Sequence, residues 1–258
     1  MIFAKGDISG LLIDLDGVIY QDNELIDGAL NTINYLKQHS IPFRFLTNAT
    51  IKTRNEICKQ LADLGIEVSI SSIFSALFAA ELYLTEQKFK NVFALLPANV
   101  LTDFPFKYDE TKEVDCVIVG DYGKQFTFDI LDNAFRFILG GAELVAAHKN
   151  KYWRNNNKLQ LDGGPFVSLL EYACDTKAKL IGKPAFTFFE MAIKNMGLEP
   201  EQILMVGDDI NTDILGGQNA GVRTAMVKTG KFRESDLKQD ITPDFVINSI
   251  KDIPNFFD

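Results

Sequence analysis

The sequence predicts an α/β protein, with a parallel sheet, helices on both faces of that sheet and a second domain inserted into the chain. Short apolar runs that end in polar residues alternate with segments of helical spacing, which is typical of parallel strands joined by helices. These runs stand near both ends of the chain, and residues 77–180 have strand and helix patterns of their own. We therefore expect a core made of residues 1–76 and 181–258 and an inserted domain of residues 77–180.

The first part of the core contains two predicted strands. Residues 10–14 form a short apolar run that ends in an acidic residue, and residues 41–48 repeat this form with a polar end. Apolar side chains at helical spacing predict a helix around residues 30–36 between them, and another helix is expected near residues 53–64. This order predicts a strand, helix, strand, helix succession.

The second part of the core continues the same pattern. Residues 202–208 form the most convincing buried-strand candidate, with helices predicted at 186–196 before it and near 213–220 after it. Residues 222–227 predict a further strand. In a sheet of this kind a ligand binds beyond the C-terminal ends of the strands, which is where the polar residues stand.

The inserted domain has its own alternation. Strands are predicted at residues 92–96, 114–119 and 144–147, and helices at 128–139 and 165–173. We expect a second, smaller α/β domain.

Composition excludes several classes of function. The net charge is −9 and no long Lys/Arg stretch is present, so nucleic acid is not an expected partner. No apolar run approaches the length that crosses a membrane, and three widely spaced cysteines fit a reducing environment, so we expect a soluble, cytoplasmic protein. Two histidines cannot form a multi-histidine zinc centre, so a bound metal would have oxygen ligands, as Mg²⁺ has.

The first polar group is the run Asp14-Leu15-Asp16-Gly17. In a phosphatase, Asp14 would attack phosphorus, while Asp16 would protonate the leaving oxygen and later activate water. An acid pair followed by glycine is equally typical of a turn or a helix cap, and this alternative stays open for the run taken alone.

Two more polar groups come later in the chain. The hydroxyl and backbone N–H groups of Thr47, Asn48 and Ala49 are suited to a phosphoryl oxygen, although the same residues are typical of an N-cap. Lys183, between Gly182 and Pro184, would neutralise charge on phosphate oxygens, although a loop lysine is more often a surface residue.

An acidic group follows the strand at 202–208. Asp208, Asp209 and Asp213 are suited to a hard divalent cation. Acidic residues also stabilise helix N-termini through the dipole, which explains Asp209 and Asp213 better than Asp208.

Together, these four ordered groups resemble the motifs of the haloacid dehalogenase (HAD) superfamily. The long insertion between the second and third motifs is similar to the C2-type cap of subfamily IIA, which includes 4-nitrophenylphosphatase and NagD-like enzymes. The runs at residues 45–50 and 161–167 look most like the branch of the haloacid dehalogenase-like hydrolase domain-containing proteins and phospholysine phosphohistidine inorganic pyrophosphate phosphatase. The resemblance implies a Rossmann-like parallel-sheet core with an inserted α/β cap.

The resemblance also implies roles for the site residues. Asp14 would be the nucleophile and a magnesium ligand, Asp16 the acid/base and a ligand through its carbonyl, and Asp208 the third ligand. Thr47, Asn48, Ala49 and Lys183 would hold the phosphoryl group. Asp209 and Asp213 are both candidates to support the ligands, and the sequence does not choose between them.

The expected function is magnesium-dependent hydrolysis of a small phosphorylated metabolite through a phospho-aspartate. The alternative is a non-catalytic regulator that binds a phospho-metabolite or a protein on the same fold, which loss of Asp14 or Asp16 would have favoured. A third hypothesis, dehalogenation or carbon–phosphorus cleavage, fits poorly with Asp16, whose acid/base role is needed for an oxygen leaving group.

The inserted domain offers weaker candidates. Four residues in a polar stretch are candidates for substrate selectivity, although a solvated loop is an equal interpretation: His148, Lys149, Trp153 and Arg154. An edge strand of the cap is a candidate surface for a homodimer.

Overall fold

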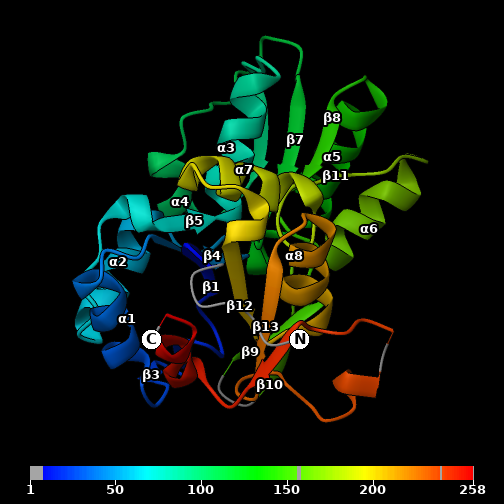
Figure 1. Cartoon of the computed structure of the whole chain (residues 1–258). Coiled ribbons are helices and arrows are strands. Elements are labelled where there is room, and N and C mark those ends of the chain that lie inside the picture. Colours follow the sequence, from blue (N-terminus) through cyan, green and yellow to red (C-terminus); the bar gives the residue numbers. More distant parts are fainter. Residues whose placement is uncertain (1–7, 156–157, 239, 258) are drawn as a thin grey trace. The chain divides into compact units, whose positions relative to one another are not determined.

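A computed structural model describes residues 8–155, 158–238 and 240–257, and the chain divides into two compact units (Figure 1). Unit 1 consists of the described residues of Met1–Thr47, Arg54–Phe74 and Lys183–Asp258. Unit 2 consists of Asn48–Thr53 and Ser75–Gly182. The short segment Asn48–Thr53, which the sequence assigned to the core, therefore makes its contacts within unit 2.

A six-stranded sheet in the order β14-β13-β12-β1-β4-β5 forms the centre of unit 1. Every pair from β14 to β4 is parallel. The strands are β1 (Gly10–Asp14), β4 (Phe43–Thr47), β5 (Ile73–Ser75), β12 (Ile203–Gly207), β13 (Arg223–Val227) and β14 (Phe245–Ile247). The middle strands β1 and β12 are buried along their whole length, as expected for parallel strands covered on both faces.

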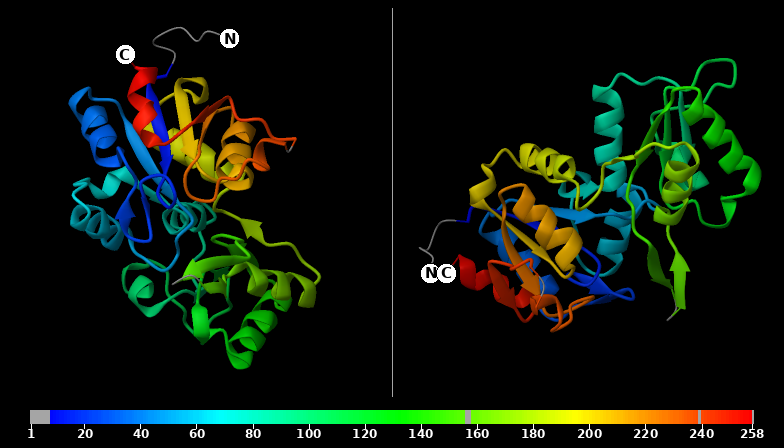
Figure 2. Two further views of the ribbon diagram at one scale, coloured as in Figure 1. Left: turned by 90° about the horizontal axis from the view of Figure 1, so that it is seen from below. Right: turned by 90° about the vertical axis from the view of Figure 1, so that its right-hand side faces the viewer.

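Side chains along β1 point alternately to the two faces of the sheet, and helices cover each face. Leu11 and Ile13 belong to one apolar cluster with residues of α1 (Ala29–Gln38) and α2 (Arg54–Asp63). On the opposite face Met205 of β12 approaches α8 (Leu215–Asn219), which packs against α7 (Phe186–Met196). The left-hand view of Figure 2 shows helices on both sides of this sheet.

Unit 1 also contains several short helical turns and strands. A π-helical turn, η4 (Ile210–Ile214), precedes α8, so the predicted helix near 213–220 begins as an irregular turn. The remaining elements are β2 (Tyr20–Gln21), β3 (Glu24–Leu25), η1 (Ile70–Ser72), η3 (Pro200–Gln202), η5 (Asp236–Lys238) and η6 (Ile250–Phe256).

Unit 2 contains its own parallel sheet, in the order β11-β8-β7-β6. Its strands are β6 (Val92–Leu95), β7 (Cys116–Val119), β8 (Glu143–Ala146) and β11 (Lys179–Leu180). Its helices are α3 (Ala76–Glu86), α4 (Ala98–Asp103), α5 (Phe128–Leu139) and α6 (Gly164–Ala173), with a 3₁₀ turn, η2 (Gly123–Gln125). An apolar cluster separate from that of unit 1 holds this sheet and α5 and α6 together. The predicted α/β class, with a parallel core sheet and a separate sheet in the insertion, is confirmed.

The sequence did not predict the antiparallel hairpin of β9 (Tyr152–Asn155) and β10 (Lys158–Leu161). The right-hand view of Figure 2 shows it extending away from the other elements of unit 2. All described residues of β10 are exposed, so the strand lacks the buried face from which a strand pattern is recognised. No helix among residues 8–155, 158–238 and 240–257 is long and apolar enough to cross a membrane.

Candidate active site

Three neighbouring strands carry polar residues to one edge of the core sheet. Asp14 is the last residue of β1, Thr47 is the last residue of β4, and Asp208 directly follows β12. Because β12, β1 and β4 are adjacent and parallel, their C-terminal ends lie at the same edge. These residues therefore stand at the strand ends beyond which ligands bind in sheets of this kind.

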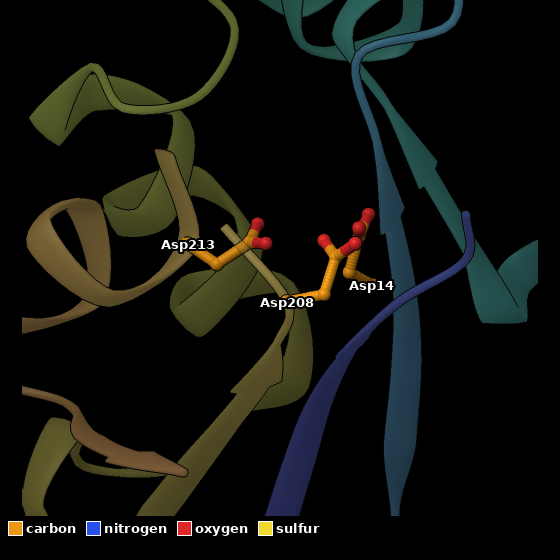
Figure 3. A group of neighbouring side chains, drawn as sticks. All are labelled: Asp14, Asp208 and Asp213. Atoms are coloured by element: carbon orange, nitrogen blue, oxygen red, sulfur yellow. The ribbon is translucent and has the colours of Figure 1, made fainter. Parts of the chain in front are cut away.

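Three carboxylates gather at this edge. Asp14, Asp208 and Asp213 each offer an oxygen, and these oxygens lie within 4.8 Å of one another (Figure 3). All three side chains are buried. Asp213 comes from η4, and a Cβ added to Gly207 would lie 2.2 Å from the Cβ of Asp213. Glycine at 207 therefore allows Asp213 to reach the cluster.

A buried lysine joins two of these acids. Lys183 Nζ donates to Asp14 Oδ1 and to Asp213 Oδ1, at 2.6 Å in each case. Burial alone would lower the pKa of Lys183, but the charges of the two carboxylates raise it above its usual value. Lys183 is therefore a fixed positive charge and not the surface loop lysine of the alternative interpretation.

Repulsion and burial disfavour the ionised carboxylates. Burial raises the pKa of Asp14, although Lys183 opposes this effect. Burial, with the charges of Asp14 and Asp213, raises the pKa of Asp208 well above its ordinary value. Burial and the charge of Asp14 raise the pKa of Asp213 to about 6. A second positive charge next to Asp208 would relieve this repulsion.

Asp208 has the features of a metal ligand. Its Oδ2 accepts a hydrogen bond from the backbone N–H of Lys231 at 2.7 Å. Its Oδ1 is buried and has no hydrogen-bond partner among the described residues. A Cβ added to Gly17 or Gly230 would lie 2.0 Å from Asp208 Oδ2, so both glycines allow close approach. An unpartnered carboxylate oxygen among clustered acids fits a hard divalent cation such as Mg²⁺.

The structure distinguishes Asp209 from Asp213, which the sequence left undecided. Asp209 Oδ1 accepts hydrogen bonds from the N–H groups of Asn211 and Thr212, and Asp209 Oδ2 pairs with Lys231 Nζ at 3.1 Å. Burial raises the pKa of Asp209, but Lys231 and the backbone bonds bring it below its usual value. Asp209 caps η4, as the dipole interpretation expects, whereas Asp213 joins the acid cluster.

The other predicted residues lie in three settings. The side chain of Asp16 is exposed and does not belong to the three-carboxylate cluster, and its backbone bridges to Tyr20. Thr47 is buried at the edge of the core sheet. Asn48 and Ala49 are half-buried and belong to unit 2.

Sequence reasoning missed the segment that holds Asp208. Thr229 Oγ1 donates to the carbonyl of Gly17 at 2.5 Å, and the next two residues, Gly230 and Lys231, contact Asp208. The available signal was a glycine between polar residues just after the strand predicted at 222–227. That position resembles those of Asp14, Thr47 and Asp208, each of which lies at or directly after the end of a core strand.

The candidates for substrate selectivity in the inserted domain do not all lie in a solvated loop. His148 is buried, so that interpretation is wrong for it. Lys149 pairs with Glu171 at 2.6 Å, and Trp153 is half-buried in β9. The side chain of Arg154 lies outside the described residues.

Comparisons with known proteins identify the family of this chain. A family profile described as haloacid dehalogenase-like hydrolase matches residues 11–104, and a profile described as HAD-hydrolase-like matches residues 180–253. Haloacid dehalogenase-like hydrolase domain-containing protein 2 of Bos taurus is 39% identical, and the match covers 89% of this chain and 87% of that protein. The chain belongs to the haloacid dehalogenase-like hydrolases.

Two other similarities place it within this family. Phospholysine phosphohistidine inorganic pyrophosphate phosphatase of Homo sapiens is 35% identical, with 89% of this chain and 86% of that protein covered. The fold matches that of 4-nitrophenylphosphatase from Thermotoga maritima, with a TM-score of 0.91, 24% identity and 98% of each chain covered. The identity to the human phosphatase supports the assignment of this chain as an enzyme of the HAD-like hydrolases, and the match to the Thermotoga maritima structure shows a shared fold.

Proposed function

We propose that this enzyme is a magnesium-dependent phosphatase that transfers a phosphoryl group from a small phosphorylated metabolite to Asp14 and then hydrolyses the phospho-aspartate. The observation that carries the proposal is the position of Asp14 at the end of β1. It is bound to the buried Lys183 and lies beside Asp208, whose Oδ1 has no hydrogen-bond partner among the described residues. The names of the relatives, which include phosphatases, support the same reaction class.

In the first step an oxygen of Asp14 attacks phosphorus and the bond from phosphorus to the leaving oxygen breaks. Attack requires the anionic carboxylate, which burial disfavours and which the charge and hydrogen bond of Lys183 favour. Lys183 therefore has two tasks, which are to keep Asp14 ionised and to neutralise charge on the phosphoryl oxygens.

Asp16 supplies the proton transfers of the cycle. Its exposed carboxyl group protonates the leaving oxygen as the first bond breaks. In the second step it removes a proton from water, the water oxygen attacks phosphorus, and the bond between Asp14 and phosphorus breaks. Asp16 then carries the proton that it gives up in the next cycle.

Asp14, Asp208 and the backbone carbonyl of Asp16 would hold Mg²⁺. When bound, the ion supplies positive charge that offsets the repulsion among these carboxylates and the charge of the phosphate. Asp213 fixes the position of Lys183 by pairing with its Nζ. Asp213 also accepts a hydrogen bond from the N–H of Asp209 at 3.2 Å, which fixes the backbone next to Asp208.

Thr47, Asn48 and Ala49, together with Lys183, bind the phosphoryl oxygens in this proposal. Unit 2 acts as the cap that selects the rest of the substrate, with the inserted segment 77–180 as its main part. The net charge of −9 supports a small substrate over nucleic acid. The free thiols of Cys58, Cys116 and Cys174 support a reducing, cytosolic location.

Rapid-quench labelling with a radiolabelled aryl phosphate tests the division of labour between the two aspartates. Asp14→Asn should abolish both acid-stable labelling and turnover, because an amide is a poor nucleophile. Asp16→Asn should still become labelled, slowly, with turnover reduced by roughly two to four orders of magnitude. Label retained on the Asp14→Asn protein, or turnover of the Asp16→Asn protein equal to wild type, would refute the proposal.

The metal requirement has its own test. Excess chelator should remove activity, and Mg²⁺ should restore it. Calcium should inhibit, because its larger and more flexible coordination shell allows Asp14 to bind through both oxygens and lose its attacking geometry. Full turnover in chelator would contradict the assignment.

A further inference from the structure

Unit 2 has a second cluster of buried polar side chains, which the reaction described above does not use. Thr50, Asp121, His148 and Asp162 are each at most 9% exposed. Asp121 and His148 follow β7 and β8, and Asp162 follows β10. The cluster therefore forms at the C-terminal edge of the parallel sheet of unit 2, with Thr50 contributed by the segment Asn48–Thr53.

His148 has a defined hydrogen-bonding role in this cluster. The backbone N–H of Asn150 donates to His148 Nδ1 at 3.3 Å, so in the neutral ring the proton is on Nε2. Nε2 lies 3.2 Å from Thr50 Oγ1 and 3.3 Å from Asp162 Oδ1. Burial lowers the pKa of His148, although the charges of Asp162 and Asp121 oppose this shift. The neutral ring therefore donates towards both oxygens.

Thr50 is held from two sides. Its Oγ1 lies beside His148 Nε2 and also accepts a hydrogen bond from the backbone N–H of Asp121 at 2.8 Å. A Cβ added to Gly120 would lie 2.9 Å from the same hydroxyl oxygen. The end of β7 and the segment after β8 thus fix one hydroxyl group, and Thr50 is almost completely buried.

The segment that Thr50 anchors carries two predicted phosphoryl ligands. Asn48 and Ala49 come directly before Thr50 in the chain. Asn48 Nδ2 lies at 3.5 Å from the side-chain oxygen of Asn150, the residue that also binds the ring of His148. A Cβ added to Gly182 would lie 2.6 Å from Asn48 Oδ1, so the residue before Lys183 packs against the same segment.

We propose that His148 and Thr50 are positioning residues, which hold Asn48 and Ala49 in the conformation that binds the phosphoryl group. This inference rests on the proposed function, because it assigns a task to residues that act through the phosphoryl-binding segment. Direct contact between His148 and substrate is not needed, and the burial of the ring argues against it. The cap of this enzyme would then contribute to phosphate binding as well as to selectivity.

Two matched pairs of variants test the inference. Thr50→Val removes the hydroxyl at nearly constant volume, and Thr50→Ser keeps it. His148→Met removes the donor, and His148→Gln keeps an N–H near the position of Nε2. Tyr83→Phe is the control, because it removes a hydroxyl that donates to Glu143 Oε1 at 2.6 Å, at the opposite end of β8.

The measurements are KM and kcat for an aryl phosphate, the inhibition constant of inorganic phosphate, and hydrogen exchange of the amides of residues 48–53. Thr50→Val and His148→Met should raise both KM and the inhibition constant about tenfold, because a lost buried hydrogen bond makes the binding conformation less populated. Because the segment binds phosphate equally before and during reaction, kcat should change less than about threefold. Exchange of the segment should become faster.

Thr50→Ser, His148→Gln and Tyr83→Phe should keep the phosphate constant of the wild type. The inference is overturned if exchange becomes faster while the phosphate constant is unchanged, or if Tyr83→Phe raises that constant as much as Thr50→Val does. It also fails if Thr50→Val and Thr50→Ser have the same phosphate constant, and His148→Met and His148→Gln do too. Failure of the proposed function looks different, because the wild type itself would then show no Asp14-dependent turnover.

Discussion

The two parallel sheets of this chain both end in clusters of buried polar side chains, and the clusters differ in how their hydrogen bonds are satisfied. At the edge of the core sheet, acids outnumber the buried cation, and Asp208 Oδ1 has no hydrogen-bond partner among the described residues. In unit 2, Asp162 Oδ1 accepts from the N–H of Gly163 at 2.7 Å, and Asp121 Oδ1 accepts from the N–H of Gly123 at 3.0 Å. The C-terminal edge of a parallel sheet thus holds an acid cluster with an unpartnered oxygen in unit 1 and a hydrogen-bonded polar cluster in unit 2.

The difference shows how a ligand site is distinguished from a structural junction. A cluster that satisfies its own polar groups stabilises the chain and needs no further partner. A cluster that leaves a buried carboxylate oxygen unpartnered is costly to the empty protein and gains when an ion binds. The core edge has this second property, whereas the edge in unit 2 fixes the segment that contains Thr50.

Lys183→Met should give the largest effect on the core cluster. It leaves the buried carboxylates of Asp14 and Asp213 without their cation, so we expect turnover to fall roughly 10²- to 10³-fold. Chemical unfolding should show a loss of about 3–5 kcal/mol. Lys59→Met is the control, because Lys59 pairs with Asp63 at 2.7 Å but both side chains are largely exposed. An equal loss of stability in the two variants would contradict the role given to burial.

Asp208→Asn should separate stability from metal binding. Burial, together with repulsion from Asp14 and Asp213, raises the pKa of Asp208, so a neutral amide at this position removes both costs. The metal-free variant should therefore unfold at a higher temperature than the metal-free wild type. Mg²⁺ should stabilise the wild type but not the variant, with affinity lowered at least about tenfold. Thermal unfolding with and without Mg²⁺ measures both effects. A variant that is less stable without metal and equally stabilised by Mg²⁺ would refute the assignment.

Two glycine substitutions compare the edges directly. Gly230→Ala adds a Cβ that would lie 2.0 Å from Asp208 Oδ2, at a φ of +63°, so Mg²⁺ affinity should fall about tenfold. Gly163→Ala adds a Cβ that would lie 2.4 Å from the carbonyl oxygen of Gly120, and it should destabilise unit 2 while leaving Mg²⁺ affinity almost unchanged. Titration calorimetry with Mg²⁺ checks both variants. Similar losses of affinity would show that the clusters are not independent.

The smallest expected effect concerns pH. The pKa of folded His148 lies below 6.5, so as the pH falls below that value the unfolded chain binds a proton that the folded chain does not bind. This contribution to the free energy of unfolding is present above pH 6.5 and is lost as the pH falls towards the pKa of the folded state. His148→Gln should lack this part of the pH dependence. Urea unfolding of both proteins across this range checks it, and parallel curves would contradict the prediction.

The sequence was sufficient to predict the α/β class and the motif positions because local patterns determine them. The apolar run before Asp14 and the acidic run after β12 are visible without any knowledge of distant contacts. The preference for Asp213 over Asp209 was not predictable, since it depends on the π-helical turn η4 and on the space left by Gly207. Both acids looked equivalent at the start of a helix.

Long-range packing explains why the sequence did not predict the burial of His148 or the contact between Lys231 and Asp208. His148 is polar and stands among polar residues, yet contacts from Thr50, Asn150 and Asp162 bury it. Lys231 is far from Asp208 in the sequence, and only the pairing of β12 with β13 brings its backbone N–H to that carboxylate. Such partners are set by topology rather than by local composition.

The central claim is that the phosphoryl group passes through Asp14, and the stereochemical course at phosphorus tests it most directly. An aryl thiophosphate made chiral with oxygen isotopes would be hydrolysed in isotopically labelled water with Mg²⁺. Each in-line displacement inverts phosphorus, so transfer to Asp14 followed by attack of water predicts net retention. Net inversion would mean that water attacks the substrate directly, and it would contradict the account.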